Sequence, residues 1–269
     1  MPISIDDLLA DLASETAVLR ARLDDLDQDG WNTITPADGW TIKDQIGHLA
    51  FFDDAVSVAI LDPDRFRSDR EDAMRGVGGF IEALTEANHV RSGGETYAWF
   101  RSARDAMAEA FVRGDPAGRV PWYGPDMSLG SALTARIMET WAHGQDVYDA
   151  LGVDHAVTPA LRQVAHIGVR ALPNSYRSNG RPVPAEQVRV ELVVAGGEQW
   201  IWGPDDALDR VGGSAVDFCL VVTQRRHVAD TRLSIEGPVA TEWMSIAQAF
   251  AGPVGAGRRP GQFPLPGNS

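Results

Sequence analysis

The clearest start of a helix in this sequence is the stretch Trp-Thr-Ile-Lys-Asp-Gln-Ile-Gly-His-Leu at residues 40–49. The Thr41 hydroxyl can accept a hydrogen bond from an amide of the first turn, and Asp44 favours the positive end of the helix. Apolar residues then recur at spacings of three, four and seven positions on one side, namely Ile42, Ile46, Leu49, Val56 and Ile60. This period is typical of an amphipathic helix, which we expect to end at about Leu61.

Three further segments of the first half repeat apolar residues with the same helical period. They cover about Ser4–Leu26, Glu95–Arg113 and Ser128–Leu151. The glycine-rich residues 76–79 lack the preceding strand and the Lys-Ser/Thr ending of a phosphate-binding loop, so we expect them only to interrupt a helix. Four long helices with few strand signals predict a four-helix bundle over residues 1–155.

The second half of the chain predicts a smaller domain of mixed structure. Its expected elements are a helix at about Thr158–Leu172, a proline-rich linker from Pro173 to Pro184, strands at 188–194 and 199–202, a helix at Ser214–Gln224, a strand at Arg232–Ile235 and a helix at Val239–Phe250. The Gly196-Gly197 pair between the first two strands indicates a β-hairpin. We therefore expect an α+β protein, with an α-β-β-α-β-α domain at residues 156–255 and a flexible tail at 256–269.

Composition excludes several classes of function. The 269 residues include 24 Lys and Arg against 38 Asp and Glu, a formal net charge of −14. This charge opposes binding to nucleic acid and to anionic membrane surfaces. The single cysteine, Cys219, excludes an internal disulfide and a cysteine-rich zinc site. Because we find neither a basic leader nor a long apolar span, we expect a cytoplasmic protein.

The predicted helix at Ser128–Leu151 carries the residues that point most directly to chemistry. Glu139 and His143 are four residues apart and share one helix face, and Asp146 follows about one turn later. They lie at the edge of the apolar ridge, where a divalent metal is one way to compensate buried ionisable groups. His48, on the flank of the helix at 41–61, is the best candidate for a third ligand. A surface Glu–His pair and a core histidine would give the same pattern, so periodicity leaves these alternatives open.

Two segments together resemble the mycothiol-dependent maleylpyruvate isomerase family, of the wider DinB/YfiT-like metalloprotein fold. They are Gly-Trp-Thr-Ile-Lys-Asp-Gln-Ile-Gly-His-Leu at 39–49 and Glu-Thr-Trp-Ala-His-Gly-Gln-Asp-Val at 139–147. The resemblance implies a DinB-like metal-binding four-helix bundle and a second domain similar to sterol carrier proteins. It places zinc ligands on His48, Glu139 and His143, a set that also suits nickel or iron. Residues 223–227 and 246–251 look more like an uncharacterised actinobacterial metal-binding subfamily, so the substrate stays open.

The resemblance also implies a thiol cofactor. The open metal position would take the thiol of mycothiol, which loses its proton on coordination and then attacks a small electrophile, in an isomerisation or an S-conjugation. The expected partners are this low-molecular-weight thiol and a small-molecule substrate, and the sequence leaves open whether the chain is a monomer or a homodimer. Two other functions remain, a protein that binds a metal and a hydrophobic ligand without turnover and a metal-dependent hydrolase that uses a metal-bound water.

Four further residues are candidates for substrate contacts or for positions beside the metal ligands. Asp53 shares the spacing of the inward-facing residues of its helix, and Asp146 could orient a ligating histidine. The isomerase relatives carry a functional arginine in the second domain, for which Arg225 and Arg226 are the candidates. The alternative for both arginines is a favourable charge at the C-terminus of a helix.

Two further features have less specific expectations. We expect His89, His155 and His227 to lie at the surface, because polar residues surround them in the sequence. The aromatic loop at residues 121–125 could wall the mouth of a pocket, with loop anchoring as the commoner explanation.

Overall fold

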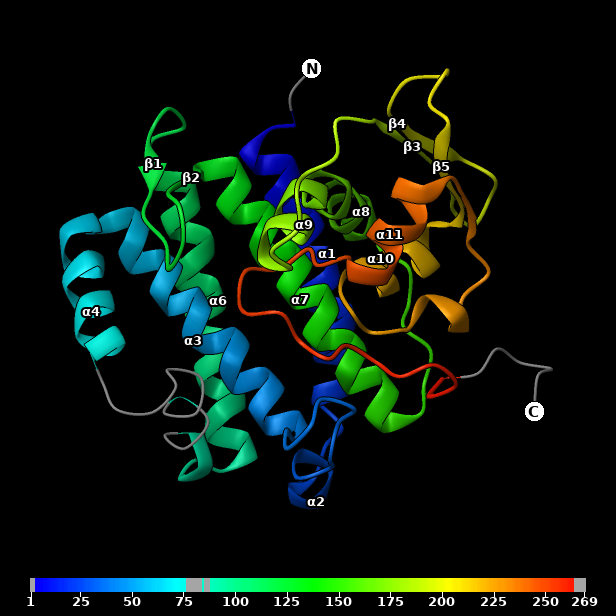
Figure 1. The fold of residues 1–269 in the computed structure, drawn as a ribbon. Coiled ribbons are helices and arrows are strands. Elements are labelled where there is room, and N and C mark those ends of the chain that lie inside the picture. Colours follow the sequence, from blue (N-terminus) through cyan, green and yellow to red (C-terminus); the bar gives the residue numbers. More distant parts are fainter. Residues whose placement is uncertain (1–2, 76–83, 85–87, 264–269) are drawn as a thin grey trace. The chain divides into compact units, whose positions relative to one another are not determined.

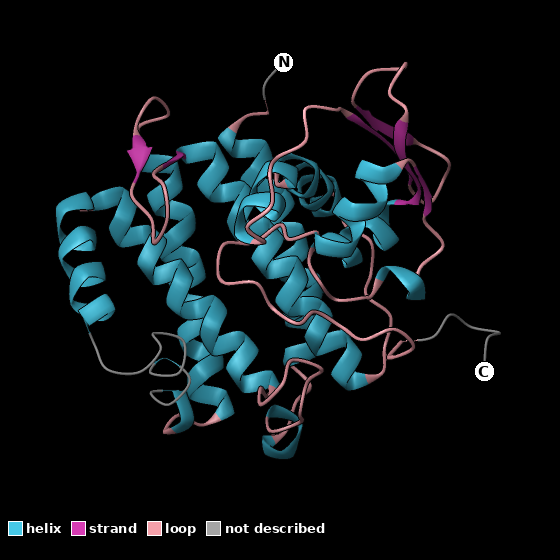
Figure 2. Cartoon of the chain, viewed as in Figure 1, coloured by secondary structure: helices cyan, strands magenta, loops and turns pink. Residues whose placement is uncertain are grey.

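The computed structural model describes residues 3–75, 84 and 88–263 (Figure 1). It is a protein of mixed helix and sheet, as the sequence predicts, with helices as the dominant element (Figure 2). The chain divides into two compact units, Met1–Ala160 and Leu161–Ser269. No helix in the described part of the chain is both long and apolar enough to cross a lipid bilayer.

Four long helices form most of the N-terminal unit. They are α1 (Ile5–Leu23), α3 (Ile42–Leu61), α6 (Gly93–Arg113) and α7 (Leu129–Leu151). Helix α3 packs against both α6 and α7, and α1 packs against α7. Shorter elements connect them, namely α2 (Gln28–Trp31), α4 (Pro63–Arg75) and the antiparallel pair β1 (Arg119–Val120) and β2 (Met127–Ser128).

Local sequence explains where these helices begin and end. The Thr41 hydroxyl accepts from the amide of Asp44, and the Asp44 carboxylate accepts from the amide of Thr41, a reciprocal capping box. Helix α7 ends at Gly152, whose φ of 65° lies in the left-handed region that favours glycine. Both boundaries agree with the sequence prediction.

The predicted apolar positions form the core of this unit. Ile42, Ile46 and Leu49 of α3 are fully buried with Leu19 and Phe100 from the neighbouring helices. A second group surrounds Val56 and includes Leu8, Leu12, Met107, Phe111, Leu133 and Ile137. Burying one such side chain contributes roughly 1.5–3 kcal/mol, so these contacts fix how α3 lies against α7.

The structure adds α4 to the helices predicted for the N-terminal unit and shortens another. The polar run after Pro63 forms α4, because proline is tolerated in the first turn of a helix and Asp62 accepts from the amide of Arg65. Helix α1 stops at Leu23 instead of Leu26. The glycine-rich residues 76–79 and the last part of the predicted tail, residues 264–269, lie outside the described residues.

The C-terminal unit is built on a four-stranded sheet of order β4-β3-β5-β6. Its elements are α8 (Ala160–Arg170), α9 (Leu172–Ser178), β3 (Val188–Val193), β4 (Gln199–Trp202), β5 (Asp209–Ser214), α10 (Ala215–Val222), the 3-10 turn η1 (Val228–Asp230), β6 (Ser234–Glu236) and α11 (Pro238–Ile246). β3 and β4 form the predicted antiparallel hairpin, β5 runs parallel to β3, and β6 is antiparallel to β5.

Two elements correct the expected α-β-β-α-β-α order. Helix α9 occupies part of the expected linker, since Pro173 lies in its first turn and does not break it. Strand β5 was not predicted, because Gly212 and Gly213 hide its strand character and Val211 is its only large apolar residue. The strand expected at Arg232–Ile235 is β6 and begins two residues later.

Candidate metal centre

Helices α3 and α7 bring His48, Glu139 and His143 together. Each offers one ligand atom, and these atoms lie within 4.8 Å of one another. Oε2 of Glu139 is 3.1 Å from Nε2 of His143 and 3.7 Å from Nε2 of His48. The two imidazole centroids are 4.2 Å apart. The three residues that the sequence singled out therefore surround one point inside the N-terminal unit.

A close contact of α3 at Gly47 holds the helix in place. A Cβ at Gly47 would come within 2.5 Å of the side-chain amide of Asn88. That amide donates to the main-chain oxygen of Lys43 at 3.1 Å, and its oxygen accepts from Thr96 of α6 at 3.1 Å. Glycine beside His48 thus lets Asn88 join α3 to α6.

Burial sets the protonation of two of the three residues. Desolvation lowers the pKa of His48 to about 3, and the neighbouring His143 adds to this effect. For Glu139, burial alone would raise the pKa, but the adjacent imidazoles of His143 and His48 hold it well below its usual value. At neutral pH His48 is therefore a neutral imidazole and Glu139 a carboxylate, the forms in which both bind metals.

These residues fit a divalent cation. Two imidazole nitrogens and one carboxylate oxygen make the three-ligand set of a catalytic zinc site with one open position. Nδ1 of His48 is buried and has no hydrogen-bond partner among the described residues. Nε2 of the same ring is the nitrogen that faces Glu139, so a cation held between them would leave Nδ1 for a further partner such as a buried water.

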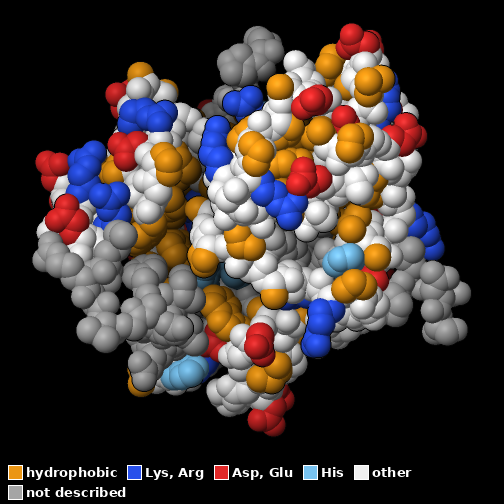
Figure 3. All heavy atoms as spheres, viewed as in Figure 1, with side chains coloured by type: hydrophobic (Ala, Val, Ile, Leu, Met, Phe, Trp, Pro, Cys, Tyr) orange, Lys and Arg blue, Asp and Glu red, His pale blue; other side chains and the backbone are white. Residues whose placement is uncertain are grey.

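Aromatic side chains enclose the centre. The ring of Trp40 lies 5.3 Å from that of His48 and 5.9 Å from that of His143. Phe52 packs against His48 at 4.6 Å, and Trp122 and Tyr123 reach Phe52 at 5.9 and 5.7 Å. The aromatic loop at 121–125 therefore borders the same wall, and Figure 3 shows apolar side chains gathered on this face along α3 and the β1–β2 loop.

Asp53 is fully buried and faces two arginines instead of the three ligand residues. Its carboxylate accepts from Nε of Arg104 at 2.7 Å and from Nε of Arg136 at 3.1 Å. Arg136 lies one turn before Glu139 on α7, and its charge adds to the lowered pKa of His48. Asp53 thus holds a cation near the centre. The sequence analysis missed both arginines, although Arg136 shares the helical spacing of Glu139 and His143.

Asp146 is fully buried on α7, three residues after His143. Nδ1 of His143 contacts Gln45 of α3, whose Oε1 lies at 2.5 Å. The sequence analysis missed Gln45. The available signal was its position three residues before His48, which places both on one face of α3.

His155 corrects the expectation of a surface position. Its ring stacks on Tyr148 at 4.3 Å and on Trp141 at 5.3 Å, and its Nε2 lies 2.7 Å from Oε1 of Glu15. Glu15 belongs to α1 and is fully buried. His89 is exposed as expected.

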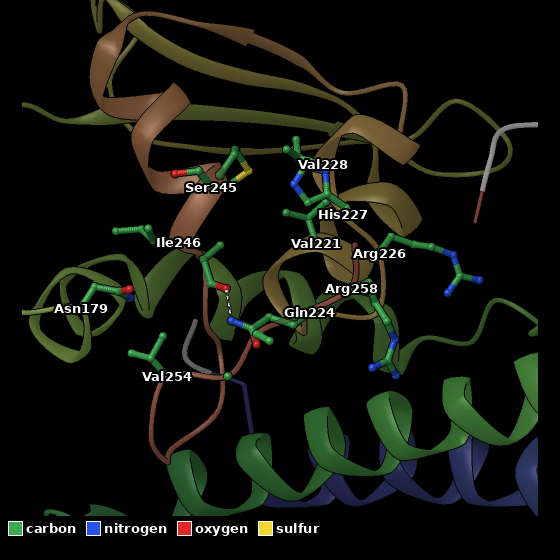
Figure 4. A pocket seen from close by; sticks show the side chains of 15 residues that line it. Asn179, Val221, Gln224, Arg226, His227, Val228, Ser245, Ile246, Val254 and Arg258 are labelled. Atoms are coloured by element: carbon green, nitrogen blue, oxygen red, sulfur yellow. Dashed lines mark hydrogen bonds between the residues drawn. The ribbon is translucent and has the colours of Figure 1, made fainter. Parts of the chain in front are cut away.

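The two candidate arginines belong to the C-terminal unit. Arg225 donates to the main-chain oxygen of Thr223, and the Arg226 guanidinium lies 3.8 Å from the ring centroid of Phe263. Arg226 borders a cavity of about 180 Å³, shown in Figure 4, where its side chain extends away from Ile246 and Ser245. His227 lines the same cavity and caps η1 by accepting from the amide of Ala229.

Residues 12–148 match the sequence profile of the mycothiol maleylpyruvate isomerase N-terminal domain. This chain belongs to that family. The matched range contains α3 and most of α7, including all three residues of the candidate centre.

The similarity extends over most of the chain. Two uncharacterised proteins, from two strains of Mycobacterium tuberculosis, are each 43% identical to it over 258 residues, which is 93% of this chain and 100% of the relative. The crystal structures of a mycothiol-dependent maleylpyruvate isomerase and of a single-residue variant match with TM-scores of 0.56 and 0.55. At 15% identity over 83% of this chain and 90% of theirs, these structures show a shared fold.

Proposed function

We propose that this protein is a metal-dependent enzyme that uses a low-molecular-weight thiol, mycothiol, to isomerise or conjugate a small electrophile. His48, Glu139 and His143 would hold the metal, zinc before nickel or iron. The convergence of these residues within the range that matches the family profile is the observation that carries the proposal. A bound divalent metal would supply the positive charge that stabilises a thiolate at neutral pH.

The residues of the chain contribute binding and shielding. His48 is kept neutral by burial, so its lone pair is available, while Glu139 stays ionised and cancels one charge of a divalent ion. The remaining positive charge suits an anionic thiolate. Trp40 packs beside both imidazole rings, and Phe52 packs beside that of His48. The chain needs no cysteine of its own for this chemistry, and its only cysteine, Cys219, is buried.

The same proposal includes a finer description of the two parts of the chain. We assign residues 1–155 to a DinB-like metal-binding bundle and residues 156–255 to a sterol-carrier-like domain. The four long helices of the first part and the sheet covered by helices in the second support this assignment. We leave Arg225 and Arg226 as candidates for substrate contacts from the second domain.

Cobalt replacement tests the thiol step. We expect the cobalt-loaded protein to develop a sulfur-to-cobalt charge-transfer band when mycothiol is added. An unchanged spectrum would contradict the thiol mechanism and leave a metal-dependent hydrolase or a binding protein without turnover. Hydrolysis of model esters by the zinc form then separates these two.

A further inference from the structure

A chain of hydrogen bonds leads from the loop before α3 to the candidate metal centre. Nδ1 of His143 contacts Oε1 of Gln45 at 2.5 Å, and Nε2 of Gln45 donates to Oγ1 of Thr35 at 2.9 Å. The Thr35 hydroxyl in turn donates to the main-chain oxygen of Trp40 at 2.9 Å. Gln45 and Thr35 are both buried, so water does not compete for these bonds.

The chemistry of these groups fixes the direction of each bond. The carbonyl of Trp40 can only accept, so Thr35 uses its hydrogen there and accepts from Gln45. The amide of Gln45 therefore turns its NH₂ group to Thr35 and its oxygen to His143. An amide oxygen also only accepts, so Nδ1 of His143 must carry a hydrogen. In the neutral ring, the lone pair is then on Nε2, the nitrogen that faces Glu139.

The second imidazole is held differently. Nδ1 of His48 has no hydrogen-bond partner in the part of the chain that the structure describes. Stacking against Phe52 and Trp40 positions the ring of His48, but such contacts do not select a tautomer. Of the two histidines, His143 is therefore the one whose Nδ1 contacts a polar side chain in the described part of the chain.

We propose that Gln45 is a positioning residue that fixes the Nδ1–H tautomer of His143 and thereby presents Nε2 to the metal. The role of Gln45 in metal binding rests on the proposed function, whereas its effect on the tautomer of His143 does not depend on that function. An outer hydrogen-bond partner typically changes metal affinity 10–100-fold. Because the amide is uncharged, it orients the ring without adding a negative charge, and the centre keeps the positive charge that a thiolate needs.

Nitrogen-15 NMR of the metal-free protein tests the tautomer directly. Above the pH range in which histidine titrates, we expect a protonated Nδ1 and an unprotonated Nε2 for His143. Gln45→Leu should shift His143 toward the Nε2–H form or a mixture. Gln145→Leu, which removes a buried glutamine on α7 that contacts His155 instead, should leave the tautomer unchanged. A wild-type ring with the hydrogen on Nε2, or no change in Gln45→Leu, would overturn the proposal.

Zinc titration then tests the consequence for binding. We expect about 10–100-fold weaker zinc binding by Gln45→Leu and recovery by Gln45→Glu, whose carboxylate also accepts from Nδ1. A general loss of packing would not be rescued by the charged residue. Thr35→Val removes the acceptor that fixes the orientation of the Gln45 amide, so it should also weaken zinc binding. This variant replaces Gln45→Leu in the test if Gln45→Leu does not fold. Wild-type affinity in Gln45→Leu would overturn the metal role, whereas a wild type that binds no metal would overturn the proposed function and leave the NMR result standing.

Discussion

Oε2 of Glu139 on α7 lies 3.7 Å from Nε2 of His48 on α3, and this contact joins two helices at an ionised group inside the N-terminal unit. A carboxylate and a neutral imidazole so placed share a site that one cation can satisfy. Without a cation, the same burial makes the fold sensitive to acid, because His48 cannot take up a proton as easily as it does in the unfolded chain.

We expect the stability of the metal-free protein to fall as the pH drops from 7 to 5. The pKa of His48 is lowered to about 3 from an ordinary value near 6.5, so between these values the unfolded chain binds a proton that the folded chain does not. This linkage costs up to about 1.4 kcal/mol per pH unit. Glu139 also lowers the stability as the pH falls, but only once the pH reaches the ordinary pKa of a glutamate, where the unfolded chain begins to bind a proton that the folded chain does not.

Urea unfolding of the chelator-treated protein at pH 7, 6 and 5 measures this dependence. His48→Asn should flatten it, while His89→Ala, at an exposed position, should not. An equally steep dependence in His48→Asn and wild type would show that another group is responsible.

Substitution of Asp53 should destabilise the protein strongly. Asp53→Asn leaves the buried guanidinium groups of Arg104 and Arg136 without their shared counter-charge. Removing one partner of a buried ion pair typically costs about 3–5 kcal/mol. The exposed carboxylate of Asp64, which pairs with Arg67 on α4, provides the control, and Asp64→Asn should cost less than about 1 kcal/mol. Equal unfolding free energies for the two variants would contradict this view of Asp53.

The pair of Glu15 and His155 should couple the segment that follows α7 to α1. Oε1 of Glu15 lies 2.7 Å from Nε2 of His155, and its other oxygen accepts from Thr158. We expect Glu15→Ala to cost about 3 kcal/mol and the double-mutant cycle with His155→Ala to show a coupling energy above about 1 kcal/mol. Glu242→Ala, which breaks a half-exposed pair with Arg181, is the matched control. Additive effects of Glu15→Ala and His155→Ala would mean that the two residues do not interact.

The parts of the fold that the sequence predicts are those that depend on nearby residues. The capping box of Thr41 and Asp44 spans three positions, and the common face of Glu139 and His143 follows from the helical period alone. Strand β5 could not be predicted in this way, because its glycines have a low intrinsic preference for strands. Pairing with β3 and β6 holds them in the sheet.

The residues of the candidate centre were predicted only in part. His48, Glu139 and His143 combine a helical period with a family resemblance. Gln45 was missed because its partner His143 is 98 positions away, a contact that only the packing of α3 on α7 creates.

The same limit applies to the partners of Asp53 and to the position of His155. The partners of Asp53 are Arg104 and Arg136, which lie 51 and 83 positions later in the chain. The inward direction of Asp53 was therefore predictable from its spacing, but its partners were not. His155 lies in a polar stretch of sequence, which predicts a surface position. Its contact with Glu15, 140 positions away, is instead made inside the protein.

The metal content of the purified protein tests the central claim most directly. Elemental analysis should find about one divalent ion per chain in wild type and in His89→Ala, because His89 is exposed and distant in sequence from the ligand residues. In His48→Ala and His143→Ala, each of which removes one of three ligands, the stoichiometric metal should be lost. Retention of a full equivalent by His143→Ala would contradict the assignment of the metal centre.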